Sequence, residues 1–244
     1  MQIKTKFICH GLYEDLFTDP EVREQVTFLN DAQFRDPSLP LNGVEGILAQ
    51  PFYFQKEILD RAPDLKWVQG TGAGYDAADV EEIRRRGLVL TNSRGVMSIS
   101  IAEDVMCKML FYTRRVREVE ANRARHHWGM FGMDQWMCTC NIDLYGKTLG
   151  ILGYGSLGGE IARRAKAFGM RVQVYDIRPV ESPDVDSCYL GAEGLDPLFA
   201  TSDFIVLTLP LNDQTHHMIN DAAFDKMKPT AMFMNVARGP IVDE

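Results

Sequence analysis

Glycines in the middle of the chain are spaced as a phosphate-binding turn requires. Gly153, Gly155 and Gly158 form the pattern G-x-G-x-x-G, with an apolar run before them and an amphipathic stretch after them. The first glycine allows a tight turn, the second lets backbone approach a pyrophosphate, and the third lets a helix pack closely on a strand. Ser156 and Leu157 then open the helix, where unpaired N–H groups and the helix dipole favour a phosphate. The pattern predicts a dinucleotide site.

A carboxylate follows where the ribose of such a dinucleotide would lie. Asp176 ends the next apolar run, roughly 20 residues beyond Gly153, where its oxygens can accept hydrogen bonds from both adenosine ribose hydroxyls. Because a carboxylate repels a 2′-phosphate, the sequence predicts NAD rather than NADP. Arg178, two residues further on, either weakens that preference or is a solvated loop charge.

Ligands of open α/β sheets bind beyond the carboxyl ends of the strands, which singles out further segments. Gly70, Gly72 and Gly74 directly follow an apolar run, and their N–H groups form either a nest for a carboxylate or a plain turn. Leu209 and Pro210 end a later run, where an apolar wall for adenine or nicotinamide is expected.

One arginine also lies at the end of a predicted strand. Arg238 follows the apolar run 232–237 and precedes Gly239. A guanidinium keeps its charge at any physiological pH and pairs with a carboxylate through two parallel hydrogen bonds. Its position predicts either a clamp for a carboxylate substrate or a surface turn.

The elements that must position these residues alternate between short apolar runs and amphipathic stretches. This βαβα rhythm predicts an α/β fold, with parallel sheets covered by helices. The first hundred residues are expected to form a small α/β unit. Its predicted strands are 6–9, 46–49, 65–69 and 88–91, and its predicted helices are 54–61 and 78–86.

From Ser100 onward the pattern changes to that of one long helix. Apolar residues recur at steps of three and four from Ile101 to Val119, which is typical of a helix with a single buried stripe. Ser100 and Glu103 predict a capping box at its start. The helix is expected to run to about Arg125.

This helix predicts the division of the chain. A boundary near Ile99 gives a small α/β domain over 1–98 and a second domain over 99–244 that carries the predicted dinucleotide site. A polar, aromatic connecting loop is expected over 123–141.

The second half opens a doubly wound sheet that the sequence leaves incomplete. Its four predicted strands are 147–152, 171–175, 203–209 and 231–236. A complete dinucleotide-binding domain has about six strands, and the last of these four would be an unpaired apolar edge, which natural sheets avoid. We therefore expect the native protein to be longer, or a partner chain to cover this edge.

Composition and charge exclude several classes of protein. The 244 residues carry a formal charge of −8 and are 45% hydrophobic, which argues against disorder and against nucleic-acid binding. No window reaches the roughly 18 apolar residues that span a bilayer, and charges come too early for a secretory leader. The five cysteines are interpreted as reduced thiols, and the spacing of Cys138 and Cys140 is assigned no metal. The chain is predicted to be cytoplasmic.

Four blocks of the sequence together resemble the D-isomer-specific 2-hydroxyacid dehydrogenases, a family that includes glyoxylate/hydroxypyruvate reductases, phosphoglycerate dehydrogenases and D-lactate dehydrogenases. The blocks are GTGAGYDAADVEEIRRRGLVLTN, IAED, LGILGYGSLGGEIARRAKAFGMRVQVYD and NVARGPIVDE. The resemblance spans nearly the whole chain, and the last two blocks are specific. It implies two doubly wound parallel-sheet domains, a flavodoxin-like substrate or catalytic domain over 1–98 and a Rossmann-type, NAD-binding domain over 99–244. It also implies an NAD-dependent oxidoreductase that transfers a hydride between nicotinamide and a small 2-oxo or 2-hydroxy acid.

The resemblance also implies roles for individual residues. Ala73 and Gly74 would offer N–H groups to the substrate carboxylate, and Arg238 would be the catalytic arginine that orients and polarises the 2-oxo acid. The implied cofactor contacts are Gly153, Gly155, Ser156, Leu157, Gly158, Asp176, Leu209, Pro210, Thr215, Val236, Ala237 and Arg238. Relatives of this kind are dimers built through the cofactor domain, so a homodimer is expected, with its interface on the long helix.

Two departures from the family pattern bear on activity. Ser93 and Arg94 stand where a proline usually precedes the glycine, which puts the hinge before the long helix in doubt. Family members also continue past the arginine block, through a catalytic Glu, a catalytic His and a helix that returns to the first domain. Turnover by this chain is therefore in doubt.

None of the histidines in the sequence is expected to replace the family's catalytic histidine. His10 ends the first predicted strand without an identified partner, and His126, His127, His216 and His217 are interpreted as exposed. The alternative function is a catalytically silent NAD-binding sensor or partner-binding module, which needs the glycine turn but no acid or base. A nonfunctional fragment is a third possibility.

Overall fold

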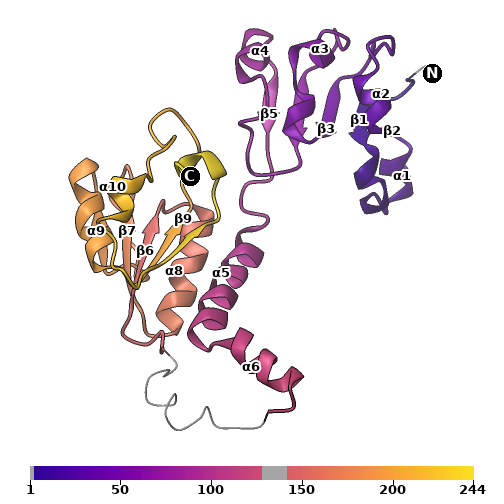
Figure 1. Cartoon of the computed structure of the whole chain (residues 1–244). Helices are drawn as coiled ribbons and strands as arrows, with labels where there is room; N and C mark the ends of the chain where they lie inside the picture. Colours follow the sequence, from indigo (N-terminus) through magenta and orange to yellow (C-terminus); the bar gives the residue numbers. More distant parts are fainter. Residues whose placement is uncertain (1–2, 128–141) are drawn as a thin grey trace. The chain divides into compact units, whose positions relative to one another are not determined.

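The computed structural model describes residues 3–127 and 142–244 (Figure 1). The chain divides into two compact units, Met1–Val96 and Met97–Glu244. Each unit is built on its own five-stranded sheet, and every strand pairing in both sheets is parallel. The predicted α/β class with two parallel sheets is confirmed.

The first unit has the strand order β2-β1-β3-β4-β5, which is the flavodoxin-like order. Its strands are β1 (Phe7–His10), β2 (Val26–Leu29), β3 (Gly46–Ala49), β4 (Trp67–Gly70) and β5 (Val89–Thr91). Its helices are α1 (Pro20–Arg23), α2 (Asp31–Arg35), α3 (Lys56–Leu59) and α4 (Val80–Arg85), with 3-10 turns η1 (Gly11–Leu16) and η2 (Pro51–Tyr53). The chain reverses its direction of winding between β1 and β3, so the carboxyl ends of these two strands are expected to flank any ligand.

The core of this unit lies on one face of its sheet. Ile8, Ile47 and Val68 point to that face and are buried beneath Leu59 of α3 and Ile83 of α4. The opposite face includes Phe7 and Val89, which remain exposed. The first unit therefore buries its sheet mainly against α2, α3 and α4.

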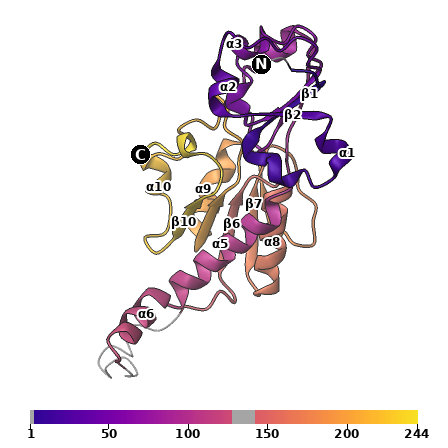
Figure 2. The same ribbon diagram turned by 90° about the vertical axis from the view of Figure 1, so that its right-hand side faces the viewer.

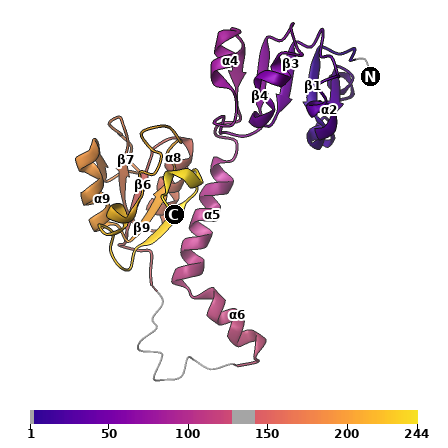
Figure 3. The same ribbon diagram turned by 45° about the horizontal axis from the view of Figure 1, so that its top comes forward.

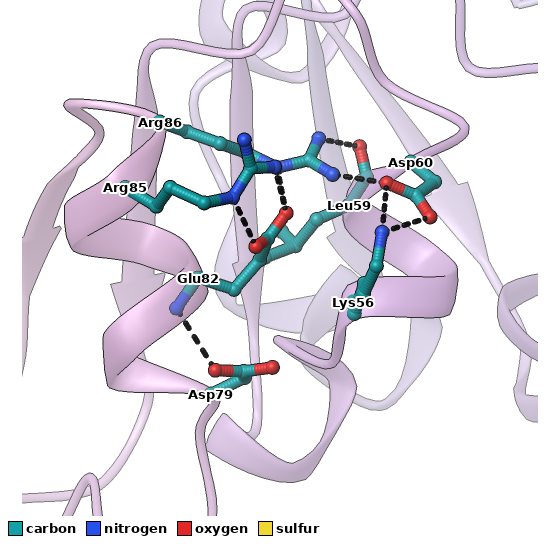
Figure 4. A network of polar contacts seen from close by, with 7 residues as sticks. All are labelled: Lys56, Leu59, Asp60, Asp79, Glu82, Arg85 and Arg86. Carbon is teal, nitrogen blue, oxygen red and sulfur yellow. Dashed lines mark hydrogen bonds and ion pairs between the residues drawn. The ribbon is translucent and has the colours of Figure 1, made fainter.

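A cluster of charged side chains joins α3 to α4 (Figure 4). The Arg86 guanidinium donates to the carbonyl oxygen of Leu59 at 2.6 Å and to Glu82 Oε1 at 2.7 Å, and it pairs with Asp60. Arg85 donates to both oxygens of the same Glu82 carboxylate. Because the Glu82 side chain is only 8% exposed, its charge depends on these two arginines for compensation.

We expect Glu82→Gln to destabilise the chain at neutral pH and to have less effect in acid. Hydrogen bonds from Arg85 and Arg86 lower the pKa of Glu82 from 4.5 to about 2. A depressed pKa in the folded state means that the stabilisation is complete above about pH 4.5 and disappears as the pH falls toward 2. Urea unfolding of both proteins at pH 7 and at pH 3 measures this, and an equal difference in unfolding free energy at both pH values would contradict it.

The second unit has the strand order β10-β9-β6-β7-β8. Its strands are β6 (Thr148–Leu152), β7 (Arg171–Tyr175), β8 (Ser187–Tyr189), β9 (Phe204–Leu207) and β10 (Met232–Asn235). Its helices are α5 (Ser98–Thr113), α6 (Val116–Ala124), α8 (Ser156–Ala167), α9 (Leu195–Thr201) and α10 (Asp221–Phe224), with 3-10 turns η3 (Ala192–Gly194) and η4 (Gly239–Ile241). Helices α5 and α8 cover one face of the sheet, and α9 and α10 cover the other (Figures 1 and 2). The sheet is therefore doubly wound.

The prediction of four strands in the second half was wrong, because β8 was missed. This strand has only three residues, Ser187–Tyr189, and lies at one end of the sheet, where it pairs with β7 alone. A strand with a single neighbour can remain partly exposed and does not need an apolar run. Among the described residues, β10 forms the other end of the sheet, next to β9.

The single long helix predicted from Ser100 was also wrong. Helix α5 ends at Thr113, and α6 begins only after Arg115, whose φ of 53° is left-handed (Figures 2 and 3). Helix α6 buries none of its residues, so no packing holds its apolar positions in line with those of α5. The predicted capping box is not formed either, because α5 starts at Ser98 and its N-terminus has no side-chain cap. Most of the connecting loop expected over 123–141, with Cys138 and Cys140, lies outside the described residues.

Candidate functional site

The glycine turn connects the central strand of the second unit to helix α8. Strand β6 is buried along its whole length, and Gly153 follows it with a φ of +99° that side-chain-bearing residues rarely adopt. The N–H of Gly153 donates to the carbonyl oxygen of Tyr175 at 2.7 Å. Helix α8 then begins at Ser156 without a side-chain cap, and Gly155 and Ser156 are exposed. The N–H groups at this helix end are therefore accessible to an anionic group.

The third glycine of the pattern allows helix and turn to touch. A Cβ atom at Gly158 would lie 2.3 Å from the carbonyl oxygen of Gly153, so no other residue fits without moving backbone. The same carbonyl accepts a hydrogen bond from Thr208 Oγ1 at 2.6 Å. Thr208 directly follows β9, so the turns after β6 and β9 are bonded together where the sheet reverses its winding. Thr208 has no place in the glycine pattern, and the sequence analysis missed it.

Asp176 lies beside this turn, at the end of β7. Its Oδ2 accepts a hydrogen bond from the N–H of Tyr154 at 2.7 Å, and its Oδ1 accepts one from the N–H of Arg178 at 3.3 Å. Two backbone groups therefore fix the carboxylate next to the helix N-terminus, while Arg178 itself is exposed. This arrangement suits a ligand with a hydroxyl-bearing sugar linked to phosphate.

Residues after β9 form one side of the turn. Leu209 is nearly buried, and its Cδ2 would lie 3.2 Å from a Cβ placed at Gly153, whereas Pro210 is exposed. The Thr215 hydroxyl donates to the carbonyl oxygen of Pro210 at 2.7 Å and accepts from the N–H of Asn212 at 2.9 Å. Thr215 thus braces the loop that carries Leu209 and Pro210.

Arg238 follows β10 after the half-buried pair Val236 and Ala237. The Asn235 side chain makes two hydrogen bonds to the backbone that follows it. Its Nδ2 donates to the carbonyl oxygen of Arg238 at 2.8 Å, and its Oδ1 accepts from the N–H of Ala237 at 2.9 Å. Beyond it, Val242 forms a parallel bridge with Ile219. The backbone of Arg238 is therefore held on both sides, and Asn235 is a supporting residue that the sequence analysis did not identify.

The glycine loop of the first unit follows β4. The N–H of Ser93 donates to the carbonyl oxygen of Gly72 at 3.1 Å, and Asn92 Nδ2 donates to that of Ala73 at 2.7 Å. Two carbonyl groups of the loop are therefore held by residues that follow β5.

His10 has a partner that the sequence analysis did not find. Its Nε2 lies 2.8 Å from Asp31 Oδ1, and its Nδ1 accepts from the N–H of Leu12 at 3.2 Å. The ring is stacked on Tyr53, whose hydroxyl also donates to Asp31. Burial, followed by this hydrogen bond to Asp31, raises the pKa of Tyr53 to about 12. Both ring nitrogens of His10 are occupied, which fits a structural histidine at the reversal point between β1 and β3.

The other histidines and the possible metal ligands add no further site. His126, His127, His216 and His217 are exposed, and the rings of the last two are stacked 3.9 Å apart. In residues 3–127 and 142–244, no group of three or more His, Cys, Asp or Glu side chains is arranged to hold a metal ion. No helix in these ranges combines the length and the apolar character that crossing a membrane requires.

Comparison with known proteins gives a consistent result. Residues 106–244 match the family described as D-isomer specific 2-hydroxyacid dehydrogenase, NAD binding domain. The glyoxylate reductase of Thermococcus onnurineus is 41% identical over 191 residues, which are 77% of this chain and 56% of that protein. The chain thus spans little more than half the length of this curated relative.

Two solved structures are similar over nearly the whole chain. A D-isomer specific 2-hydroxyacid dehydrogenase family protein from Aeromonas salmonicida has a TM-score of 0.81 and 27% identity, covering 99% of this chain and 76% of its own. The D-lactate dehydrogenase of Aquifex aeolicus, solved with NAD and lactic acid, has a TM-score of 0.79 and 25% identity, covering 97% of this chain and 70% of its own. The family match covers more than half of the residues and includes the glycine turn, Asp176 and Arg238. The chain therefore belongs to the D-isomer specific 2-hydroxyacid dehydrogenase family.

Proposed function

We propose that this chain is an NAD-dependent oxidoreductase that transfers a hydride between nicotinamide and a small 2-oxo or 2-hydroxy acid. The observation that carries the proposal is the uncapped N-terminus of α8 beside the fixed carboxylate of Asp176. A silent NAD-binding module would need the same turn. The family match and the relatives' names, which include glyoxylate reductase and D-lactate dehydrogenase, favour the enzyme.

The residues at the glycine turn fit NAD. Exposed backbone at Gly155 and Ser156 leaves room for a pyrophosphate, which the N–H groups of Ser156 and Leu157 would bind. Asp176 would accept hydrogen bonds from the adenosine ribose. The remaining proposed contacts line the turn or lie beyond it toward the nicotinamide: Gly153, Gly158, Leu209, Pro210, Thr215, Val236, Ala237 and Arg238. NAD, when bound, supplies or accepts the hydride.

Each unit offers its own candidate donors for the carboxylate of a substrate. In the first unit, the N–H groups of Ala73 and Gly74 would bind a carboxylate as a small nest. In the second unit, Arg238 would orient a 2-oxo acid and stabilise the negative charge that develops on its carbonyl oxygen as the hydride arrives. A permanent cation on a braced backbone suits that role.

Binding of the reduced cofactor tests the proposal first. NADH at 100 times its dissociation constant should stabilise the chain against unfolding by about 2.7 kcal/mol, and NADPH should stabilise it less because of Asp176. Turnover of glyoxylate and hydroxypyruvate, followed by NADH absorbance, then separates an enzyme from a silent binding module. No stabilisation by NADH would contradict the cofactor assignment.

The proposed homodimer is supported by an apolar groove on the second unit. This groove of about 650 Å³ is bordered by α5, α6 and α8, and it is lined by Glu103, Met106, Cys107, Leu110, Phe111, Arg114, Val116, Arg164 and Phe168. Exposed apolar surface of this kind marks association sites, and we propose a second copy of the chain as its occupant. Sedimentation equilibrium that gives the mass of one chain, 27.6 kDa, would contradict the homodimer.

We also propose a cytoplasmic location, which the free thiols of Cys9, Cys107 and Cys188 support.

A further inference from the structure

Tyr154, the residue between the first two glycines of the turn, makes two hydrogen bonds in two directions. Its backbone N–H donates to Asp176 Oδ2 at 2.7 Å, and its phenol hydroxyl donates to Ser182 Oγ at 2.8 Å. The side chain is half-buried, and its ring would lie 3.8 Å from a Cβ placed at Gly159 of α8. One residue therefore contacts the carboxylate at the end of β7 and the loop that follows it.

That loop, residues 177–186, is also held at its far end, where Asp186 pairs with Lys166 and accepts a hydrogen bond from the N–H of Val172 at 2.7 Å. Ser182 Oγ also accepts from the N–H of Asp184 at 3.2 Å, so the serine that receives the phenol sets the turn of the loop. Val180 and Val185 pack partly buried against the same core cluster as Tyr154. At the start of the loop, Ile177 is 79% exposed. The Tyr154–Ser182 hydrogen bond links the middle of the loop to the glycine turn.

We propose that Tyr154 is a positioning residue for the adenosine end of the cofactor, acting through Ser182. The phenol holds loop 177–186 against the start of α8, and the loop in turn holds Asp176 in place through the N–H of Arg178. This inference rests on the proposed binding of NAD. The affinity for NAD would then depend on the Tyr154 side chain as well as on the glycines and on Asp176.

The test uses the full chain, with ADP-ribose and NADH as probes. Tyr154→Phe keeps the ring and its packing but removes the hydroxyl, and Ser182→Ala removes the acceptor. Each variant is expected to bind ADP-ribose about fivefold more weakly than wild type, the usual effect of one lost hydrogen bond between neutral groups. NADH should lose the same factor, because the contact lies at the adenosine end that both probes share.

A double-mutant cycle separates positioning from general damage. Because both substitutions remove one hydrogen bond, the double variant should bind ADP-ribose no more than about fivefold more weakly than wild type. Thr201→Val is the matched control: it removes a hydroxyl at the end of α9 that bonds the Gln173 side chain of β7 at 3.0 Å, outside loop 177–186, and should leave affinity unchanged.

Three outcomes would overturn the inference. Binding by Tyr154→Phe within twofold of wild type would show that the hydroxyl is not needed, and multiplicative losses in the double variant would show that the two residues act separately. An equal loss in Thr201→Val would show a general effect of destabilisation. Failure of the wild-type chain to bind either probe would instead contradict the proposed function.

Discussion

Replacing Gly158 by alanine is expected to weaken NADH binding by about a hundredfold and to destabilise the chain by about 1–3 kcal/mol. The added Cβ would lie 2.3 Å from the carbonyl oxygen of Gly153, which belongs to backbone and cannot rotate away. Helix α8 must then move away from the turn, and its N–H groups leave the position of the pyrophosphate. Isothermal titration with NADH and urea unfolding measure the two effects.

The neighbouring glycine provides the control. A Cβ at Gly159 would lie 3.8 Å from the Tyr154 ring, which is an ordinary contact, and alanine is a better helix former than glycine. Gly159→Ala should therefore bind NADH like wild type and be at least as stable. Equal losses in both variants would mean that α8 tolerates no substitution here for reasons other than the contact with Gly153.

Arg238→Met is expected to lower kcat/KM for glyoxylate by about a hundredfold or more while NADH affinity stays within about twofold. Methionine keeps much of the side-chain length but removes the cation that would stabilise charge on the substrate oxygen, a loss of about 2.7–4 kcal/mol where such donors have been removed. Arg238→Lys should recover only part of the activity, because an ammonium group cannot reproduce the paired hydrogen bonds of a guanidinium.

Steady-state kinetics test the role of Arg238 separately from the proposed activity of the chain. Steady-state rates at saturating NADH, with glyoxylate varied, give kcat and KM for each variant. Unchanged turnover in Arg238→Met would remove this arginine from the reaction. A wild-type chain that binds NADH without reducing glyoxylate or hydroxypyruvate would instead favour the silent binding module.

Sequence was sufficient for two strands in the interior of the sheets. Strands β3 and β7 were predicted with the bounds that the structure shows, because both lie within their sheets and consist largely of apolar residues. The two missed strands, β2 and β8, are both end strands that keep only one neighbour and stay partly exposed. Strand β8 is Ser-Cys-Tyr and carries little apolar signal, whereas β2 is Val-Thr-Phe-Leu, which is mostly apolar, and was overlooked.

The same limit applies to the candidate site. The glycines and Asp176 could be recognised because their spacing along the chain reflects a local turn and the next strand. Thr208 is 55 positions from Gly153, whose carbonyl it binds, and only the strand order brings the two together. The break at Arg115 was missed for a related reason, because the apolar periodicity continues through it while the packing does not.

Two fixed points, one on either side of Arg238, restrict the backbone that carries its guanidinium. The chain is secured by pairing with β9 as far as Asn235 and again by the bridge at Val242, and Asn235 closes the short strap between them. The entropic cost of immobilising this strap has therefore already been met during folding. Under the proposed function, binding of a substrate anion would therefore require little further ordering of this strap.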